Sequence, residues 1–440
     1  MELTTTSRCV KIACLAGLLL SPIAQAEGLL EDSKLNLKTR NIAMYLYDDD
    51  QDIDDVKEHF AWAQGLTIDY QSGYLADIIG FDATYAGVIK LGANDHFQNR
   101  DLLRDNDGKA EGFNKISQIY AKAKLGDEDL YANLYGGWKE LYKTGALTVS
   151  RSRAITSSYQ GISGEVGYKG LRLRGVYTNR FSDRNTPEKK RFKTFSGKKI
   201  DNIITGDLSY SWGKTNVVNL FSGVSKDYLR RDGLEFKWLT PLSEKSKIGM
   251  TGYFYQNDGL DNWEGIPFDD KATHYNLNLD YMVGAWALTG SYAYTEAERS
   301  NGLGMFYWNM GGKNTDGNFN SKADGAGLDY HKDGETMVGG QAMYNMASAG
   351  YPGLMLGARA NYGFGMEFKG ADIDEATLDF LAMYKFQDKS LKGLSMMVGV
   401  GPGYSYAMDK AMNPVIENGD WKKRHFVAAT FVLDYKFNLL

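Results

Sequence analysis

Extended segments in which apolar and polar side chains alternate recur along most of this chain, each about ten residues long. In residues 79–89, for example, Ile79, Phe81 and Ile89 share one face, and the pattern repeats in residues 171–177, 286–294 and 376–386. A period of two indicates β-strands whose two faces meet different surroundings. Globular strands average about five or six residues, whereas a tilted membrane-spanning strand needs about nine to eleven. The segment lengths therefore favour a transmembrane β-barrel.

The chain ends on the same pattern. In residues 431–440 one face carries Phe431, Leu433, Tyr435 and Phe437, and the other carries Val432, Asp434, Lys436 and Asn438. We expect the first face to meet lipid and the second a water-filled interior. A final strand inside a closed wall leaves no edge exposed. We also expect this strand to be the one that the barrel-assembly machinery binds.

Short turns alternate with long polar connections along the chain. The turns fall near 125–129, 168–170, 212–215, 241–246, 282–285, 347–352 and 387–392. The long connections are 47–60, 92–113, 182–199 and, longest of all, about 297–333. Short periplasmic turns and long extracellular loops are typical of outer-membrane barrels. We expect an all-β, antiparallel barrel of about 18 strands; a secreted β-sandwich or solenoid is the alternative, but its strands would be shorter.

The first residues resemble a secretory signal peptide. Arg8 and Lys11 precede an apolar run, and the small residues at 24–26 form a cleavage pattern, so we expect a signal peptide of residues 1–26. A membrane anchor fits less well because the apolar run is short. A lipoprotein processed at Cys14 fits less well because Lys11 stands where that signal needs an aliphatic residue. The remaining residues, 27–440, then form a single barrel domain without cysteine, in which disulfides cannot contribute.

Charge and motif content exclude other functional classes. The net charge is −5 and no basic block appears, which argues against nucleic-acid binding. The five histidines, His59, His96, His274, His331 and His425, lack metal-ligand spacing, and there is no Gly-x-Ser-x-Gly motif. We therefore expect neither an enzyme nor a bound metal or cofactor. Acidic residues at 48–55 could bind divalent cations that bridge lipopolysaccharide, but a solvated loop is the better explanation, because the glycine and terminal glutamate of an EF-hand are absent.

Short stretches throughout the chain resemble the OprD family of outer-membrane porins. The most specific is WAQGLTIDYQSGY (62–74), and others are AEGLLEDSKLNLKTRN (26–41), RAITSSYQG (153–161), AGYPGLMLGARANY (349–362), LKGLSMMVGV (391–400) and the terminal YKFNLL. The resemblance implies an eighteen-stranded porin, monomeric or loosely trimeric, whose loops fold inward to form a constriction. Two further stretches, 69–82 and 332–346, resemble the chitooligosaccharide-uptake branch of the family.

Strand parity places a set of cations on the interior face. They are Lys38, Arg40, Lys122, Lys124, Arg172, Arg174, Lys237 and Arg359. A column of cations would give an anionic solute successive weak sites, and the OprD resemblance implies a basic ladder of this kind. The alternative is that these charges only solvate the channel and pair with acids such as Asp69, Asp82, Asp207, Asp280 and Asp379. We include Asp280 among the pore-lining candidates.

The third long connection, about 139–160, contains Arg151, Arg153 and Tyr159. The resemblance matches Arg153 to an arginine of the family's inward-folding loop. If the loop folds inward, these residues lie where the pore is narrowest and the field is most concentrated. An ordinary extracellular loop is the alternative.

Aromatic side chains offer stacking surfaces for a sugar. They are Trp138, Trp263, Phe306, Tyr307 and Trp308. Loop packing or an interfacial girdle would use the same residues.

These features predict an integral protein of the bacterial outer membrane, in contact with lipid and lipopolysaccharide, that passes small hydrophilic solutes by diffusion. Chitooligosaccharides are one candidate substrate; small carboxylates, basic amino acids or peptides are another. A barrel adhesin or a barrel hydrolase is the non-transport alternative.

Overall fold

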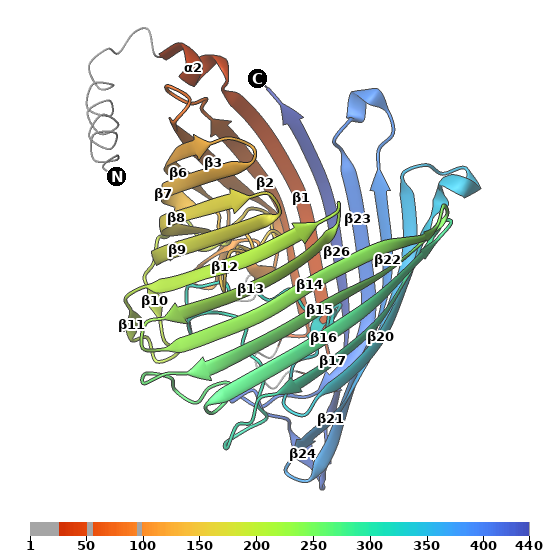
Figure 1. The fold of residues 1–440 in the computed structure, drawn as a ribbon. Coiled ribbons are helices and arrows are strands. Elements are labelled where there is room, and N and C mark those ends of the chain that lie inside the picture. Colours follow the sequence, from red (N-terminus) through yellow and green to blue (C-terminus); the bar gives the residue numbers. More distant parts are fainter. Residues whose placement is uncertain (1–25, 51–55, 95–98, 440) are drawn as a thin grey trace.

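The structure is a computed structural model that describes residues 26–50, 56–94 and 99–439. Its main element is one antiparallel sheet of 18 strands (Figure 1). The strands are β1 (Lys34–Asp48), β2 (Glu58–Gln71), β3 (Ile79–Ala93), β6 (Phe113–Gly126), β7 (Leu130–Lys139), β8 (Ser158–Tyr168), β9 (Leu171–Ser182), β12 (Ile203–Trp212), β13 (Asn216–Ser225), β14 (Leu229–Ser243), β15 (Ser246–Gly259), β16 (Lys271–Val283), β17 (Trp286–Glu296), β20 (Thr336–Asn345), β21 (Leu354–Phe368), β22 (Ala371–Lys385), β23 (Ser395–Tyr406) and β26 (Lys423–Asn438).

The sheet closes on itself. β1 pairs with β2 on one side and with β26 on the other, so the first and last strands share one ladder. Closure gives the edge groups of both strands a hydrogen-bonding partner. The predicted all-β barrel of about 18 strands is confirmed.

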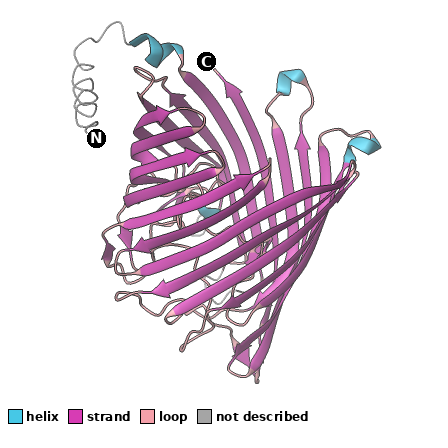
Figure 2. Ribbon diagram, in the orientation of Figure 1, coloured by secondary structure: helices cyan, strands magenta, loops and turns pink. Residues whose placement is uncertain are grey.

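Within the described residues, helices are few and short (Figure 2). They are α2 (Ala26–Glu31), η1 (Asn99–Asp101), η2 (Met346–Ala349) and η3 (Lys389–Leu391). None of the helices in the described ranges is long and apolar enough to cross a membrane. Residues 1–25, which hold most of the predicted signal peptide, lie outside the described part of the chain.

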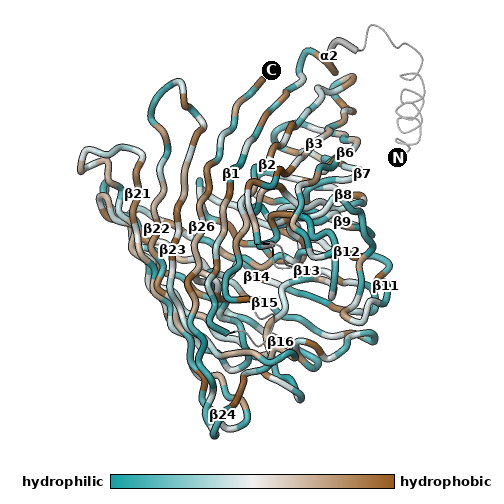
Figure 3. Tube along the Cα trace, turned by 180° about the vertical axis from the view of Figure 1, so that it is seen from behind, coloured by the Kyte–Doolittle hydropathy of each residue, from teal (hydrophilic) through white to brown (hydrophobic). Residues whose placement is uncertain are grey.

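Side chains alternate between the two faces of the wall as the sequence predicts. Phe81, Ile89 and Leu173 are 47%, 61% and 56% exposed on the outer face, and their strand neighbours point inward. On β26, Val432 packs inward against Ile42 of β1, which leaves Phe431 on the outer face. The tube along the Cα trace, coloured by hydropathy, shows hydrophobic and hydrophilic residues mixed along the strands (Figure 3).

The two rims differ in their connections. Turns such as 169–170, 213–215 and 284–285 lie at the short-turn rim, beside both chain ends. Long connections lie at the opposite rim and carry the small hairpins β4–β5 (Arg104–Asn106, Lys109–Glu111), β10–β11 (Phe192–Lys193, Lys199–Ile200), β18–β19 (Asp324–Gly325, Leu328–Asp329) and β24–β25 (Ile416–Glu417, Asp420–Trp421). The long-loop rim has two exceptions, because 226–228 and 369–370 are tight hairpins there.

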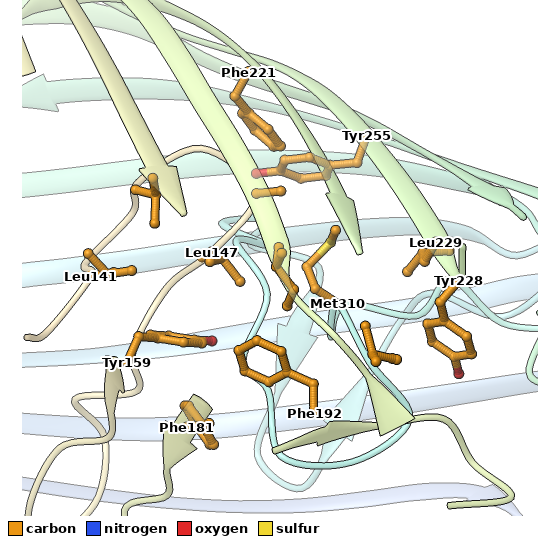
Figure 4. Packing of buried hydrophobic residues seen from close by; sticks show 14 of the residues in the cluster. Leu141, Leu147, Tyr159, Phe181, Phe192, Phe221, Tyr228, Leu229, Tyr255 and Met310 are labelled. Atoms are coloured by element: carbon orange, nitrogen blue, oxygen red, sulfur yellow. The ribbon is translucent and has the colours of Figure 1, made fainter. Parts of the chain in front are cut away.

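Loops fill part of the barrel and form its largest apolar core. That core joins inward residues of the wall, such as Phe221 and Tyr255, to loop residues such as Leu147, Phe192 and Met310 (Figure 4). Because the core lies against β12–β16, it occupies that side of the interior. The larger open space remains beside β1, β21, β22, β23 and β26.

Candidate functional site

Residues 140–157, between β7 and β8, lie inside the barrel. The backbone N–H of Gly145 donates to Asp207 Oδ2 (2.6 Å), and the N–H of Ala146 donates to Thr205 Oγ1 (2.7 Å). Both acceptors are on the inner face of β12. Gly145 has a positive φ of 56°, and an added Cβ would come within 2.2 Å of the Thr205 hydroxyl, so the close approach requires glycine.

A second loop, between β17 and β20, meets the first through Asp316. Tyr159 donates its hydroxyl to the Asp316 carbonyl (2.6 Å) and accepts from the Asp316 N–H (2.8 Å). Ser157 Oγ donates to Asp316 Oδ2 (2.7 Å). Tyr159 is 1% exposed and packs on Phe181 and Phe192 (Figure 4). Its predicted place on the pore surface is therefore wrong, because the ring serves to fix the two loops together.

Arg231, on the inner face of β14, holds the longer loop from the other side. Its guanidinium donates to the carbonyls of Tyr307 and Trp308, and its Nε donates to Asn257 Oδ1 (2.8 Å). The side chain is fully buried. Several donors in one rigid fork suit a cation that anchors loop carbonyls. Arg231 is not among the residues predicted from the sequence, although strand parity places it inside.

Two cavities remain inside the barrel, of about 720 Å³ and 520 Å³. Both are lined by Arg40 of β1 and by Arg151 and Arg153 of the inward loop. The second cavity also reaches Asn36 and Asn438, near the short-turn rim. The three arginines therefore stand where one space passes into the other, which makes this the candidate constriction.

Arg40 is fixed by a carboxylate and by the loop. Its Nε and Nη2 donate to the two carboxylate oxygens of Asp434 on β26, each at 2.7 Å. Its Nη1 donates to the carbonyls of Arg151 and Arg153. Arg40 thus both carries charge at the constriction and positions the loop that narrows it.

The two loop arginines are held differently. Arg151 has a side chain that is 50% exposed, lies 3.8 Å above the Tyr142 ring and is 3.5 Å from Glu140 Oε2. Arg153 donates from Nε to the carbonyl of Arg100 (2.9 Å). Burial, together with the charge of Arg184, lowers the pKa of Arg153 to about 10. It therefore remains a cation at neutral pH.

Arg359 forms a second charged group in the larger cavity. It contacts Asp379 of β22 at 2.8 Å and Asp324 of the longer loop at 3.1 Å. Asp324 and Asp434 were not selected from the sequence. Parity puts Asp434 on the inner face, whereas nothing in the sequence places Asp324, since it lies in a loop.

The other charged residues predicted to line the pore are spread over the interior. Lys38 lines the smaller cavity, and Arg172, Lys237 and Asp280 lie on inward faces of β9, β14 and β16. Lys122 pairs with Asp82 (2.6 Å), Lys124 is 3.8 Å from Asp77, and Arg174 pairs with Asp207 (2.9 Å). Lys122 and Arg174 thus have the acidic partners that the alternative explanation requires.

Four of the aromatic residues proposed for sugar stacking pack within the loops, and the fifth, Trp138, lies near the end of β7. Phe306 is fully buried and stacks on Phe319 (5.3 Å), and Trp138 is 8% exposed. Trp263 stacks on Phe268 at 4.5 Å, and Trp308 lies 5.0 Å from His331. Tyr307 donates its hydroxyl to the carbonyl of Gly311 (2.8 Å). These contacts are loop packing, and Phe306 has no surface left for a solute.

Within residues 26–50, 56–94 and 99–439, no three His, Asp or Glu side chains come together as metal ligands. His96 and residues 52–55 of the acidic stretch lie outside the described residues.

Comparisons with known proteins agree with this architecture. Residues 27–401 match the family model described as "outer membrane porin, OprD family". Porin D of Pseudomonas aeruginosa is 24% identical over 375 residues, which are 80% of this chain and 76% of that protein. These comparisons give no specific support to the chitooligosaccharide branch of the family.

Solved structures show the same fold at low identity. OccAB1 of Acinetobacter baumannii superposes with a TM-score of 0.78 at 16% identity, covering 95% of this chain and 100% of that one. OccAB3 of the same organism superposes with a TM-score of 0.76 at 19% identity, and the match covers 93% of this chain and 100% of OccAB3. OpdK of Pseudomonas aeruginosa, in a structure with vanillate, superposes with a TM-score of 0.70 at 16% identity. The match covers 93% of this chain and 100% of OpdK.

Proposed function

The chain belongs to the OprD family of outer-membrane porins, and from that premise we propose that it is a channel selective for small organic anions, carboxylates above all. The members of this family are non-enzymatic, substrate-specific channels of the bacterial outer membrane. The identity of the solute is the part that we propose.

One observation carries the proposal: cations outnumber carboxylates in both cavities. The larger cavity is lined by Arg40, Arg100, Arg151, Arg153, Arg359 and Lys385, against Asp324, Asp379 and Asp434. The smaller is lined by Lys38, Arg40, Lys139, Arg151, Arg153 and Lys436, against Asp69 and Glu140. An excess of one sign in a narrow, low-dielectric passage concentrates ions of the opposite sign.

The geometry suggests how an anion passes. A carboxylate that enters the larger cavity meets Arg151 and Arg153, neither of which has a carboxylate in bidentate contact. Arg40 is already neutralised by Asp434, so it attracts the solute less strongly. A path of moderately attractive sites favours entry and still allows release. Lys38 and Lys436 then stand on the side of the short-turn rim.

Two considerations favour a carboxylate over a sugar. The predicted aromatic platform is packed inside the loops, so sugar rings would find little flat apolar surface at those residues. The relative OpdK has a structure with vanillate, a carboxylate.

Planar-bilayer recordings test the proposal. Under a KCl gradient the wild-type channel should be anion-selective, and acetate should carry current or reduce the chloride current. The double substitution Arg151→Gln and Arg153→Gln should reduce both effects, while Lys214→Gln, at a turn of the short-turn rim, should leave them unchanged. Cation selectivity in the wild type, or current block by chitohexaose and not by carboxylates, would overturn the proposal.

A further inference from the structure

An apolar strip faces the interior of the barrel on β21, β22 and β23. On β22, Asp379 points inward to Arg359, and alternation gives Leu381 and Met383 the same inward direction. Met383 lies directly opposite Met355 of β21 and Met397 of β23 in the two ladders. These neighbouring strands run side by side in Figures 1 and 3. We call Met355, Leu381, Met383 and Met397 the methionine strip.

The strip is open to the pore. Met383 and Met397 are 36% and 38% exposed, and with Leu381 they line the same cavity as Arg40 and Arg359. The inner face of an aqueous barrel is ordinarily polar. A contiguous apolar surface that the loops leave uncovered there indicates a binding site.

Met343 of β20 packs beside the strip and is itself buried, at 5% exposure. It is opposite Gly357 of β21, and its sulfur occupies the place where a side chain at that position would be, 2.0 Å from an added Cβ. Gly399 of β23 similarly leaves room beside Leu381, whose Cδ2 would lie 3.4 Å from an added Cβ. The two glycines therefore keep the apolar surface low and continuous.

A basic side chain stands at each end of the strip, and the one at the long-loop end, Arg359, is neutralised by Asp379 and Asp324. Arg359 lies at the end nearer the long loops, and Lys385, on the inward face of β22, lies at the short-turn rim. Lys385 is six positions after Asp379 on β22, which is about 20 Å at the rise of an extended strand. Leu381 and Met383 occupy the interval.

We infer that the methionine strip is a subsite for the unbranched apolar chain of an organic anion, whose carboxylate is attracted by Lys385. This inference rests on the proposed function and adds the solute class: alkyl carboxylates of medium chain length. Methionine has three rotatable bonds and a polarisable sulfur, so a row of thioethers adapts to a flexible chain. Full burial of one methylene would change affinity about fourfold, which sets the upper limit of discrimination per carbon.

The experiment compares acetate, butanoate and octanoate, which share one charge, as blockers of single-channel chloride current. In the wild type we expect the concentration for half-block to fall with each added carbon. Met383→Gln with Met397→Gln keeps side-chain length but adds polar groups, and should flatten this dependence while acetate block is retained.

Two further variants separate a binding role from a folding role. Met383→Leu with Met397→Leu keeps the surface apolar and should preserve the dependence on chain length. Met412→Gln lies in the connection between β23 and β26, is 54% exposed, and should behave as the wild type. Equal half-block concentrations for the three acids in the wild type, or an unchanged dependence in the glutamine variant, would overturn the inference. A wild-type channel that is neither anion-selective nor blocked by acetate would instead overturn the proposed function itself.

Discussion

Arg40 and Asp434 form a bidentate ion pair across the seam that closes the barrel. They are directly opposite in the ladder between β1 and β26, and both nitrogen–oxygen distances are 2.7 Å. The same guanidinium donates to two carbonyls of the constriction loop. One residue pair thus joins strand closure, loop position and pore charge.

Asp434→Asn should increase anion selectivity, because it leaves the charge of Arg40 uncompensated at the constriction. Arg40→Gln should decrease it and should also loosen the loop, since the donors to the Arg151 and Arg153 carbonyls are lost. Reversal potentials in a KCl gradient measure both effects. If the reversal potentials of the two variants shift in the same direction from the wild-type value, the roles assigned to Arg40 and Asp434 are wrong.

Tyr159→Phe should destabilise the folded barrel by about 1–3 kcal/mol, because the backbone N–H and C=O of Asp316 lose a buried partner. We expect a lower thermal midpoint in detergent and more frequent current fluctuations. Tyr168→Phe is the matched control, because Tyr168 lies at the opposite end of the same strand and is 47% exposed. Equal midpoints for the two variants would show that Tyr159 does not anchor the loops.

The buried carboxyl group of Asp316 predicts that the stability of the folded protein depends on pH. Burial, with the nearby charge of Asp183, raises the pKa of Asp316 from 3.8 to about 6. Between these values the folded protein holds a proton that the unfolded chain has released, so stability falls as pH rises from about 4 to 6 and is then flat. Other carboxylates titrate in the same window, so the wild type must be compared with Asp316→Asn.

The thermal midpoint of the wild type, relative to that of Asp316→Asn, should therefore decline over this window and stay constant from pH 7 to 8. If the wild-type midpoint, relative to that of Asp316→Asn, rises with pH in the same window, then folding lowers the pKa of Asp316 and does not raise it.

Arg231→Ala should release the longer loop from the β14 wall. Each lost hydrogen bond from a charged donor is worth about 1.5–3 kcal/mol, and the carbonyls of Tyr307 and Trp308 would be left without that donor. We expect a higher and noisier single-channel conductance. Arg230→Ala is the control, since its neighbouring side chain is 52% exposed and pairs with Asp232 instead. Unchanged conductance in both variants would mean that the loop is held by other contacts.

Local pattern was enough to predict the wall of this protein. The face on which Phe81 or Leu173 lies follows from a period of two, and the turns near 168–170 and 212–215 separate strands that pair in the structure. Such features depend on neighbours in the sequence, so the sequence displays them. The same parity places Arg40, Arg359 and Asp434 inside.

Parity does not say which charges remain unpaired. Arg174 and Lys122 face inward as predicted, yet each has an acidic partner, whereas Arg153 projects from a loop to which no parity applies. Tyr159 was selected for its loop and is instead buried, because the position of Asp316, 157 residues away, decides its surroundings.

The sequence alone thus determined a closed, lipid-facing barrel with charged residues inside, because alternation and turn spacing are properties of adjacent residues. Only the tertiary structure decided where the pore narrows, which arginines stand there and which wall is apolar. Those features depend on loops folding back into the barrel and on contacts such as Arg40 with Asp434, which are 394 residues apart.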